Sequence, residues 1–245
     1  MTSYAQRWRD NAARRAIAPD VVVEIAEHHG IDAAALDLLD RYEEITDPHG
    51  KSFFLIPRGT SGDEARRAVL LTYVVNAGTD YGKAVGRPGV TNDFPETAYS
   101  TAEVRRIRDR QRANSWSYDR DVRFVHRNGG RLMTTPHGIL MGTGGNWLQR
   151  LYSQRGGTTW GDIFMVKTAR GADPGEALRG IVRAESPRLA LDRLLHHEER
   201  HSAQWAELGY AGMLRAYSWE LLREFVFRRT NRLELAAGLR DGGYC

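Results

Sequence analysis

The stretch LLHHEERH, residues 194–201, decides how the C-terminal part of this 245-residue chain is expected to fold. It contains the pattern His197-Glu198-x-x-His201. Residues four apart lie one above the other on a helix, so both imidazoles can reach one divalent cation with the intervening glutamate beside it. The pattern therefore predicts a helix on which His197 and His201 bind Zn²⁺.

Residues around the motif predict where this helix begins and ends. Ser186 can be the N-cap, Pro187 suits the first helical position, and Gly209 suits a left-handed C-cap. Both histidines then lie on a largely apolar face. Burying two imidazoles and a carboxylate without a cation is costly, so metal ligation is favoured over a plain buried pair.

The other polar residues of the stretch are expected off the ligand face. His196 points about 100° around the helix from His197, which predicts a supporting or surface position. Glu199 and Arg200 are expected on the solvated side of the helix.

A catalytic zinc site needs a third protein ligand and an open position. No histidine follows His201, and the single cysteine, Cys245, cannot form a thiolate cluster, which leaves carboxylates. The downstream carboxylates are Glu207, Glu220, Glu224, Glu234 and Asp241. Glu207 is rotated off the ligand face. Glu220 and Glu224 lie in the next predicted helix, whose apolar residues predict packing beside the first: Leu214, Tyr217, Leu221 and Phe225. For Glu234 there is a second interpretation, because Asn231 and Glu234 also have the spacing of a capping box.

The motif, followed after a second helix by Asn231-x-x-Glu234-x-x-Ala237, resembles the gluzincin group of zincin metallopeptidases. In that group the later glutamate is the third zinc ligand, so the resemblance implies that role for Glu234. The run 158–166 also resembles the edge strand that lines the zincin cleft. The resemblance covers roughly residues 158–244, and its motif is similar to that of small bacterial zincin-like proteins.

The resemblance implies a zinc-dependent hydrolase, most simply a metallopeptidase, in which Glu198 is the general base. An extended peptide would add as a strand along residues 158–166. The candidate substrate or transition-state contacts are Thr158, Thr159, Trp160, Tyr210, Tyr217, Arg240 and Tyr244.

Two alternatives to a peptidase stay open. The chain has no histidine after His201 to stabilise an oxyanion, which favours a zinc hydrolase acting on a non-peptide amide or a related small molecule. The other alternative is a noncatalytic binding protein in which the metal site is structural or the motif accidental.

Local patterns predict an α+β fold. In the first part we expect helices over 4–16, 20–29, 33–45 and 64–76 and a short strand over 53–56. Strands are expected over 122–126, 131–135, 139–141 and 163–166, with Asn128-Gly129-Gly130 as a hairpin turn, giving a small, mostly antiparallel sheet before the metal helix. The Gly- and Pro-rich loop 80–97 is the candidate boundary. The predicted division is a mainly helical N-terminal region of unknown role, residues 1–95, and a zincin-like metal-binding domain, residues 96–245.

Composition predicts a soluble chain without a membrane partner. Hydrophobic residues make up 41% of the sequence, enough for a real core, and no run of 18 apolar residues occurs. The N-terminus lacks the apolar segment of a signal peptide, so we expect a cytoplasmic protein or one exported without a cleaved signal.

A net charge of +4 raises the question of nucleic acid. The run 105–112 is rich in arginine and is followed by Trp116 and Tyr118, which could stack on bases. Acidic residues such as Asp109 interrupt it, so we interpret the run as a solvated helix and expect a peptide or protein substrate rather than nucleic acid. The sequence leaves the oligomeric state open.

Overall fold

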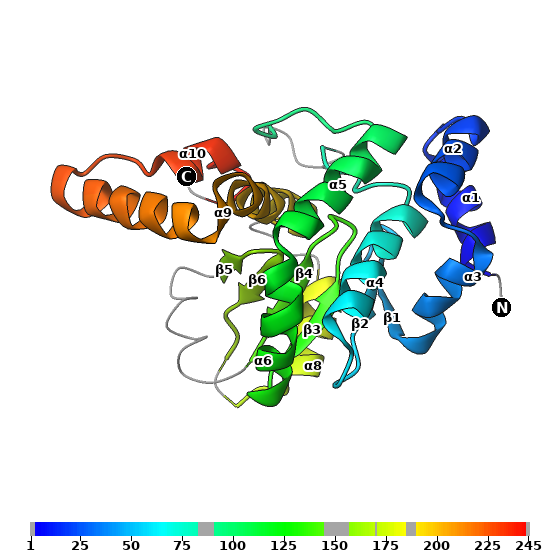
Figure 1. Ribbon diagram of the computed structural model, residues 1–245, viewed down its shortest axis with the longest axis horizontal. Coiled ribbons are helices and arrows are strands. Elements are labelled where there is room, and N and C mark those ends of the chain that lie inside the picture. Colours follow the sequence, from blue (N-terminus) through cyan, green and yellow to red (C-terminus); the bar gives the residue numbers. More distant parts are fainter. Residues whose placement is uncertain (1–2, 83–90, 145–156, 170, 185–189, 244–245) are drawn as a thin grey trace.

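The computed structural model describes residues 3–82, 91–144, 157–169, 171–184 and 190–243. Its centre is one six-stranded mixed sheet in the order β1-β2-β3-β4-β6-β5 (Figure 1). The strands are β1 (Glu43–Thr46), β2 (Ser52–Leu55), β3 (Arg131–Thr134), β4 (Leu140–Thr143), β5 (Gly157–Trp160) and β6 (Ile163–Val166). Of the pairings between these strands, β4 with β6 is parallel and the others are antiparallel. The expected α+β class is therefore confirmed.

Apolar side chains on alternate strand positions build a core on each face of the sheet. Leu132, Leu140 and Ile163 lie in one buried cluster, whereas their neighbours Met133 and Met141 lie in the other. This alternation follows from the two-residue repeat of a strand. The helices around the sheet are α4 (Gly62–Val75), α5 (Thr101–Ala113), α6 (Val122–Arg127) and α8 (Pro174–Arg183). The first cluster includes residues of α4 and α6, and the second includes residues of α8 and of the start of α9 (Leu191–Phe227).

The N-terminal helices form where the capping signals predict them, with one exception. Helices α1 (Tyr4–Arg14) and α2 (Pro19–His29) agree with expectation. The helix expected over 33–45 is wrong in its second half: α3 (Ala33–Leu36) passes through a 3₁₀ turn into strand β1. Ile45 is buried in that strand opposite Phe53, and this sheet packing outweighs local helix propensity.

The strand expected over 122–126 is also wrong, because Val122–Arg127 is helix α6, preceded by a π-helical turn over Ser117–Asp121. Val122 and Val125 lie three residues apart and bury the same helix face. The glycines after it end the helix instead of making a hairpin turn: Gly130 N donates to Val125 O, and Gly129 has φ +84°.

The metal-motif helix is longer than expected. Helix α9 (Leu191–Phe227) continues past Gly209, where φ 67° and ψ 168° bend it sharply. Gly209 therefore redirects the helix instead of capping it. The expected caps Ser186 and Pro187 lie outside the described residues.

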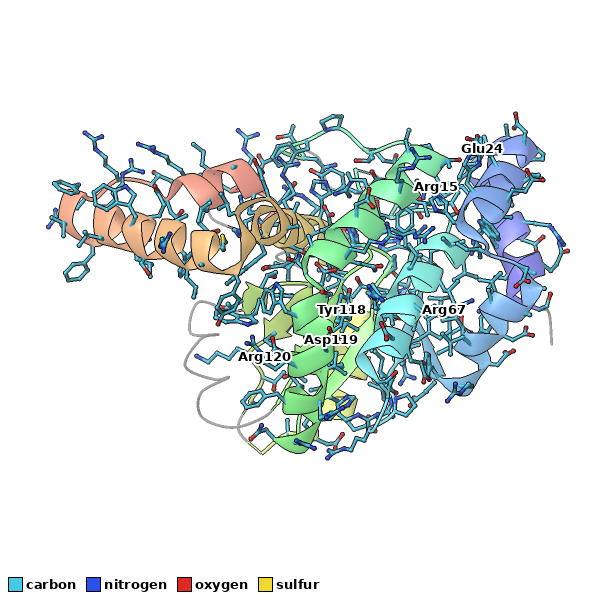
Figure 2. All side chains as sticks on the ribbon, viewed as in Figure 1. Arg15, Glu24, Arg67, Tyr118, Asp119 and Arg120 are labelled. Carbon is cyan, nitrogen blue, oxygen red and sulfur yellow. The ribbon has the colours of Figure 1, made fainter. Side chains whose placement is uncertain are left out.

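The part of α9 after Gly209 was expected to pack beside the first part, and that expectation is wrong. It projects from the body as an arm, along which α10 (Arg232–Ala237) runs back (Figure 1). Side chains project from the visible sides of this arm (Figure 2). Among the described residues, no helix is both long and apolar enough to cross a bilayer.

The proposed division at residue 95 falls between strands of one sheet. Phe54 and Leu55 of β2 pair with Thr134 and Met133 of β3, so both parts of the chain contribute to the sheet. Whether the two parts fold separately stays a prediction.

Candidate metal centre

Three side chains from two helices bring their ligand atoms to one point. The Nε2 atoms of His197 and His201 are 3.0 Å apart, and Glu234 Oε2 lies 3.3 Å from each of them. A tetrahedral ion with bonds of about 2.0–2.1 Å has ligand atoms about 3.3 Å apart. The cluster is buried, with His197 2% exposed and His201 9% exposed. These residues could hold a metal ion.

Hydrogen bonds on the far side of each ring aim both histidines at that point. His197 Nδ1 lies 2.9 Å from the carbonyl oxygen of Gly238, and His201 Nδ1 lies 2.9 Å from Gln204 Oε1. Gln204 is itself fixed, because its Nε2 donates to Leu233 O. Since both acceptors are oxygens, each Nδ1 donates a proton to its partner, and each Nε2 is the ring atom that faces Glu234. A hydrogen bond from the ring nitrogen that faces away from the metal is typical of metal-binding histidines.

The Glu234 side chain belongs to the cluster, while the Asn231 side chain caps helix α10. Asn231 Oδ1 accepts from the backbone N–H groups of Leu233 and Glu234 at the start of α10. The Glu234 carboxylate faces the two imidazoles. The N-cap and the ligand interpretation of this segment are therefore compatible.

Two other candidate ligands are engaged elsewhere. Glu220 pairs with Arg223 at 2.6 Å and accepts from the backbone N–H of Arg232. Asp241 accepts from Arg193 at 2.9 Å.

The electrostatics of the cluster favour a cation. Burial raises the pKa of Glu234, but hydrogen bonds from His197 and His201 outweigh it and hold that pKa well below its usual range. Burial lowers the pKa of His201, but the hydrogen bond to Glu234 and the charges of Glu198 and Glu234 raise it overall. The lowered pKa keeps Glu234 ionised, so its carboxylate and that of Glu198 place negative charge near the two Nε2 atoms.

Glu198 lies beside the cluster and is held by the edge strand. Its Oε2 accepts from Thr159 Oγ1 at 2.6 Å, and both residues are 7% exposed. Burial raises the pKa of Glu198 above its usual range. A buried carboxylate with a raised pKa is suited to accept and return a proton near neutral pH.

The expected edge strand over 158–166 is a hairpin in which only β5 lies at the edge of the sheet, and part of its free edge is covered. The run 158–166 forms β5 and β6, and β5 is the outermost strand. Thr159 O accepts from Trp205 Nε1 at 3.0 Å, so this carbonyl is not free to bind an added strand. A peptide added along β5 would have to avoid that position.

Aromatic residues form a wall on the Trp205 side of β5. Trp160 and Trp205 have ring centroids 4.8 Å apart, and Tyr210 and Trp116 complete the group, with centroids 4.9 Å apart. Tyr210 is 39% exposed. Two of the predicted contacts, Trp160 and Tyr210, thus lie together beside the strand that holds Glu198.

The other predicted contacts come from β5, the arm and the C-terminal segment. Thr158 pairs with Met165 within the sheet, and Tyr217 lies on the exposed arm. Arg240 Nη1 donates to Thr91 Oγ1 at 2.6 Å. Tyr244 lies outside the described residues.

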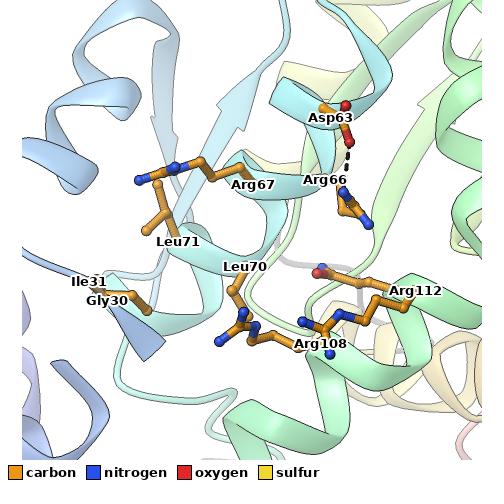
Figure 3. A pocket seen from close by; sticks show the side chains of 10 residues that line it. Gly30, Ile31, Asp63, Arg66, Arg67, Leu70, Leu71, Arg108 and Arg112 are labelled. Carbon is orange, nitrogen blue, oxygen red and sulfur yellow. Dashed lines mark hydrogen bonds and ion pairs between the residues drawn. The ribbon is translucent and has the colours of Figure 1, made fainter. Parts of the chain in front are cut away.

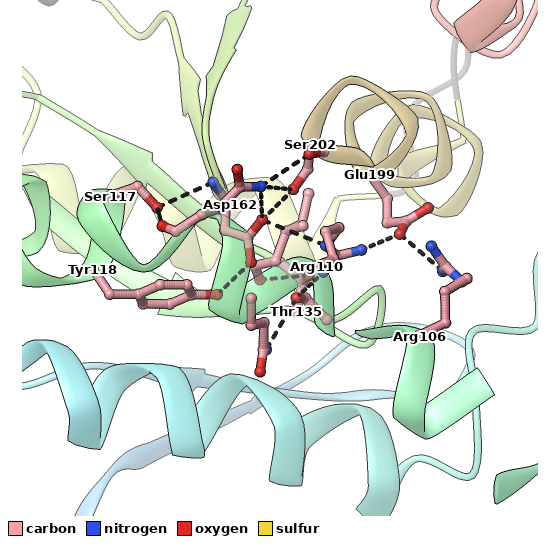
Figure 4. Close-up of polar contacts among 12 residues, drawn as sticks. Arg106, Arg110, Ser117, Tyr118, Thr135, Asp162, Glu199 and Ser202 are labelled. Atoms are coloured by element: carbon pink, nitrogen blue, oxygen red, sulfur yellow. Dashed lines mark hydrogen bonds and ion pairs between the residues drawn. The ribbon is translucent and has the colours of Figure 1, made fainter. Parts of the chain in front are cut away.

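A buried polar network beneath α9 holds the metal helix, and it contradicts the prediction that Glu199 faces solvent. Glu199 is 7% exposed and pairs with Arg110 and Arg106 (Figure 4). Burial raises the pKa of Glu199, but the two guanidinium groups outweigh this and lower it to about 2. Arg110 also reaches Asp162, which accepts from Asn114 Nδ2 at 2.7 Å.

Asn114 continues this network onto α9, because its Nδ2 also donates to Ser202 O at 2.9 Å. The sequence signal for the network is the spacing of Arg106, Arg110 and Asn114, which puts them on one face of α5. That face was interpreted as solvated, and this interpretation is wrong.

Other arginines of α5 face a separate cavity of about 470 Å³. Arg108 and Arg112 line it together with Arg66 and Arg67 of α4 (Figure 3). Arg66 is paired with Asp63 at 2.6 Å. This cavity shares no lining residue with the metal cluster.

The C-terminal segment that supplies the Gly238 carbonyl is anchored by polar contacts. Arg240 N donates to Asp93 Oδ2 at 2.7 Å, and Asp241 binds Arg193 and the Tyr81 hydroxyl. His196 stacks on Tyr81 with ring centroids 3.6 Å apart, so it supports this segment and is not a ligand.

Gly238 adopts φ +99°, where L side chains are strained. A Cβ there would lie 2.7 Å from the Phe94 ring. The residue that orients His197 therefore has to be glycine.

No protein-family model matches this chain, and neither a curated protein nor a solved structure is similar to it.

Proposed function

We propose that the chain is a zinc-dependent hydrolase whose metal ligands are His197, His201 and Glu234. The observation that carries the proposal is the orientation of the two imidazoles, because the Nδ1 hydrogen bonds turn both Nε2 atoms toward one carboxylate oxygen. Two imidazoles and one carboxylate are a ligand set of catalytic zinc sites that keep a position open. The likeness to gluzincins supports the same assignment.

Zn²⁺ bound by these residues would supply Lewis acidity, polarising a carbonyl and making water a stronger acid. Glu198 is the general base in this proposal: it takes a proton from the attacking water and passes it to the leaving group. The Thr159 hydroxyl donates to Glu198 Oε2 and so fixes which carboxylate oxygen remains for that proton. Glu199 and Arg110 do not contact the substrate in this proposal; their ion pair holds α9, and with it the metal ligands, in position.

A peptide bond is the simplest substrate, because β5 is an edge strand next to Glu198. The wall of Trp160, Trp205 and Tyr210 favours an apolar or aromatic group beside the scissile bond.

The second candidate is a zinc hydrolase of a small non-peptide amide. The bond from Trp205 Nε1 to Thr159 O favours it, since it covers part of the strand edge that an extended peptide would use. A small amide needs the open metal position and the aromatic wall, but no free strand edge.

The test compares wild type, Glu198→Gln and the control Glu207→Gln on peptide libraries and on small aryl amides. Glu207 is exposed on the same helix. We expect Glu198→Gln to retain zinc and to lose about 10²–10⁴-fold in turnover, while Glu207→Gln behaves as wild type. Full activity of zinc-loaded Glu198→Gln would contradict the proposed base.

The two substrate classes separate in the same assay. Cleavage of peptides that a zinc chelator blocks supports the peptidase, and chelator-sensitive turnover of aryl amides alone supports the second candidate.

A further inference from the structure

The exposed apolar surface of the described residues is concentrated in residues 208–235. From here on, the arm denotes this segment: the part of α9 around and after the bend, with the first residues of α10. Of the large apolar side chains that are exposed, all but Val23 and Phe124 lie on it. Those on the arm are Leu208, Tyr210, Leu214, Tyr217, Trp219, Leu221, Leu222, Phe225, Val226, Phe227 and Leu235. Concentrated apolar exposure of this kind marks an interaction site.

The apolar residues at the tip of the arm cover more than one side of the helix. Phe225, Val226 and Phe227 are 90%, 55% and 60% exposed and end helix α9. Successive helical residues are about 100° apart, so these three point over about 200° of the helix circumference, and Glu224 lies on the remaining side. A partner helix or groove covers one side of a helix, whereas a fluid apolar phase covers all of them.

The charge of the tip is positive. Arg228, Arg229 and Arg232 follow the apolar residues and are exposed, and the segment 225–232 contains no acidic residue. The nearby Glu220 is buried and paired with Arg223. An arm with an apolar end and an adjoining cationic belt matches the boundary between acyl chains and anionic headgroups.

We propose that this tip binds the surface of an anionic phospholipid bilayer. Phe225, Val226 and Phe227 enter the headgroup boundary, and Arg228, Arg229 and Arg232 contact lipid phosphates. The contact is shallow, consistent with the lack of a helix that could cross a bilayer among the described residues. This differs from the expectation of no membrane partner, which considered long apolar runs and not a short exposed tip.

A second copy of the chain fits the tip less well. A twofold contact places the same surface on both partners. It would bring Arg228 and Arg229 of each copy together, with Glu224 as the one acidic residue of the segment 221–232 to offset them.

Attachment through the tip leaves the metal centre free. The segment 210–227 spans about 27 Å at about 1.5 Å per residue, and Glu234 lies on α10, which runs back toward the body (Figure 1). The bilayer contact thus does not depend on the proposed hydrolase activity, and turnover of soluble substrates should not need it.

The test is flotation of the full chain with vesicles of phosphatidylcholine, alone or mixed with phosphatidylserine. We expect wild type to float with the mixed vesicles and much less with phosphatidylcholine alone. The double variant Phe225→Ser/Phe227→Ser should lose binding, and Arg228→Gln/Arg229→Gln should weaken it about tenfold or more. The matched control Val23→Ser/Phe124→Ser removes exposed apolar side chains elsewhere and should float like wild type.

Three results would overturn the proposal. One is no flotation of monodisperse wild type with the mixed vesicles, and another is unchanged flotation of both tip variants. The third is self-association that Phe225→Ser/Phe227→Ser abolishes while no vesicles are bound, which would assign the tip to contact between copies. Circular dichroism and zinc content of each variant show that the fold and the metal centre are intact.

Discussion

The ion pair beneath the metal helix gives a sharp stability prediction for Glu199→Gln. Glu199 is buried and pairs with Arg110 and Arg106, which lower its pKa from 4.5 to about 2. A shift of that size corresponds to about 3 kcal/mol at neutral pH. Removing one member of a buried ion pair costs about 3–5 kcal/mol when the other charge loses its partner, and the lower end applies here because Arg110 keeps Asp162 and Arg106 keeps Glu103. We therefore expect Glu199→Gln to lower the free energy of unfolding by about 3 kcal/mol.

The loss should depend on pH in a defined direction. The folded-state pKa of Glu199 lies below its unfolded value, so its contribution is complete above pH 4.5 and disappears as the pH falls toward 2. Urea unfolding of wild type and Glu199→Gln at several pH values measures this difference. The control is Glu176→Gln, which removes an ion pair with Arg179 whose glutamate side chain is 72% exposed and should cost less than about 1 kcal/mol. A cost for Glu199→Gln as small as that control, or one that does not change with pH, would refute the reasoning.

Three further predictions concern the proposed ligand Glu234, the glycine whose carbonyl orients His197, and the buried His126. Glu234→Ala should purify folded with strongly reduced zinc content by elemental analysis, whereas Glu207→Ala keeps it; equal zinc in both would remove Glu234 from the site. Gly238→Ala should cost about 1–3 kcal/mol in urea unfolding, because of its φ of +99° and the Phe94 ring, and should weaken zinc binding in a competition assay. Burial and nearby arginines lower the pKa of His126 from 6.5 to about 4, so the folded state favours the neutral ring and stability falls as pH drops from 6.5 to 4. His126→Phe should remove about 2 kcal/mol of that fall, allowing for partial solvent screening, and an unchanged pH profile of unfolding would contradict this.

The parts of the site that the sequence predicts are those set by local helix geometry. His197, Glu198 and His201 lie within five residues, so their relative positions follow from the helix repeat. Glu234 is 33 residues from His201. Its place beside the imidazoles depends on the bend at Gly209 and the return of α10, so the resemblance to a family suggested it and residue spacing did not.

The sequence-based predictions are wrong where tertiary packing, and not the local sequence, determines the conformation or burial of a residue. Glu199 was expected in solvent because the residues facing it come from α5, nearly ninety positions earlier in the chain. Val122 and Val125 fit a strand or a helix equally well over so short a run, and their packing on the sheet selects the helix. The apolar residues after Gly209, which include Phe225, predict packing beside the first part of α9. The bend at Gly209 instead turns them toward solvent.

The central claim is that the two imidazoles and Glu234 bind one zinc ion, and elemental analysis of purified wild type beside His197→Ala tests it most directly. The proposed function predicts about one equivalent of zinc in wild type and a large loss in His197→Ala, with both proteins folded by circular dichroism. Folded wild type that takes up no zinc, or equal zinc in the two proteins, would contradict the claim.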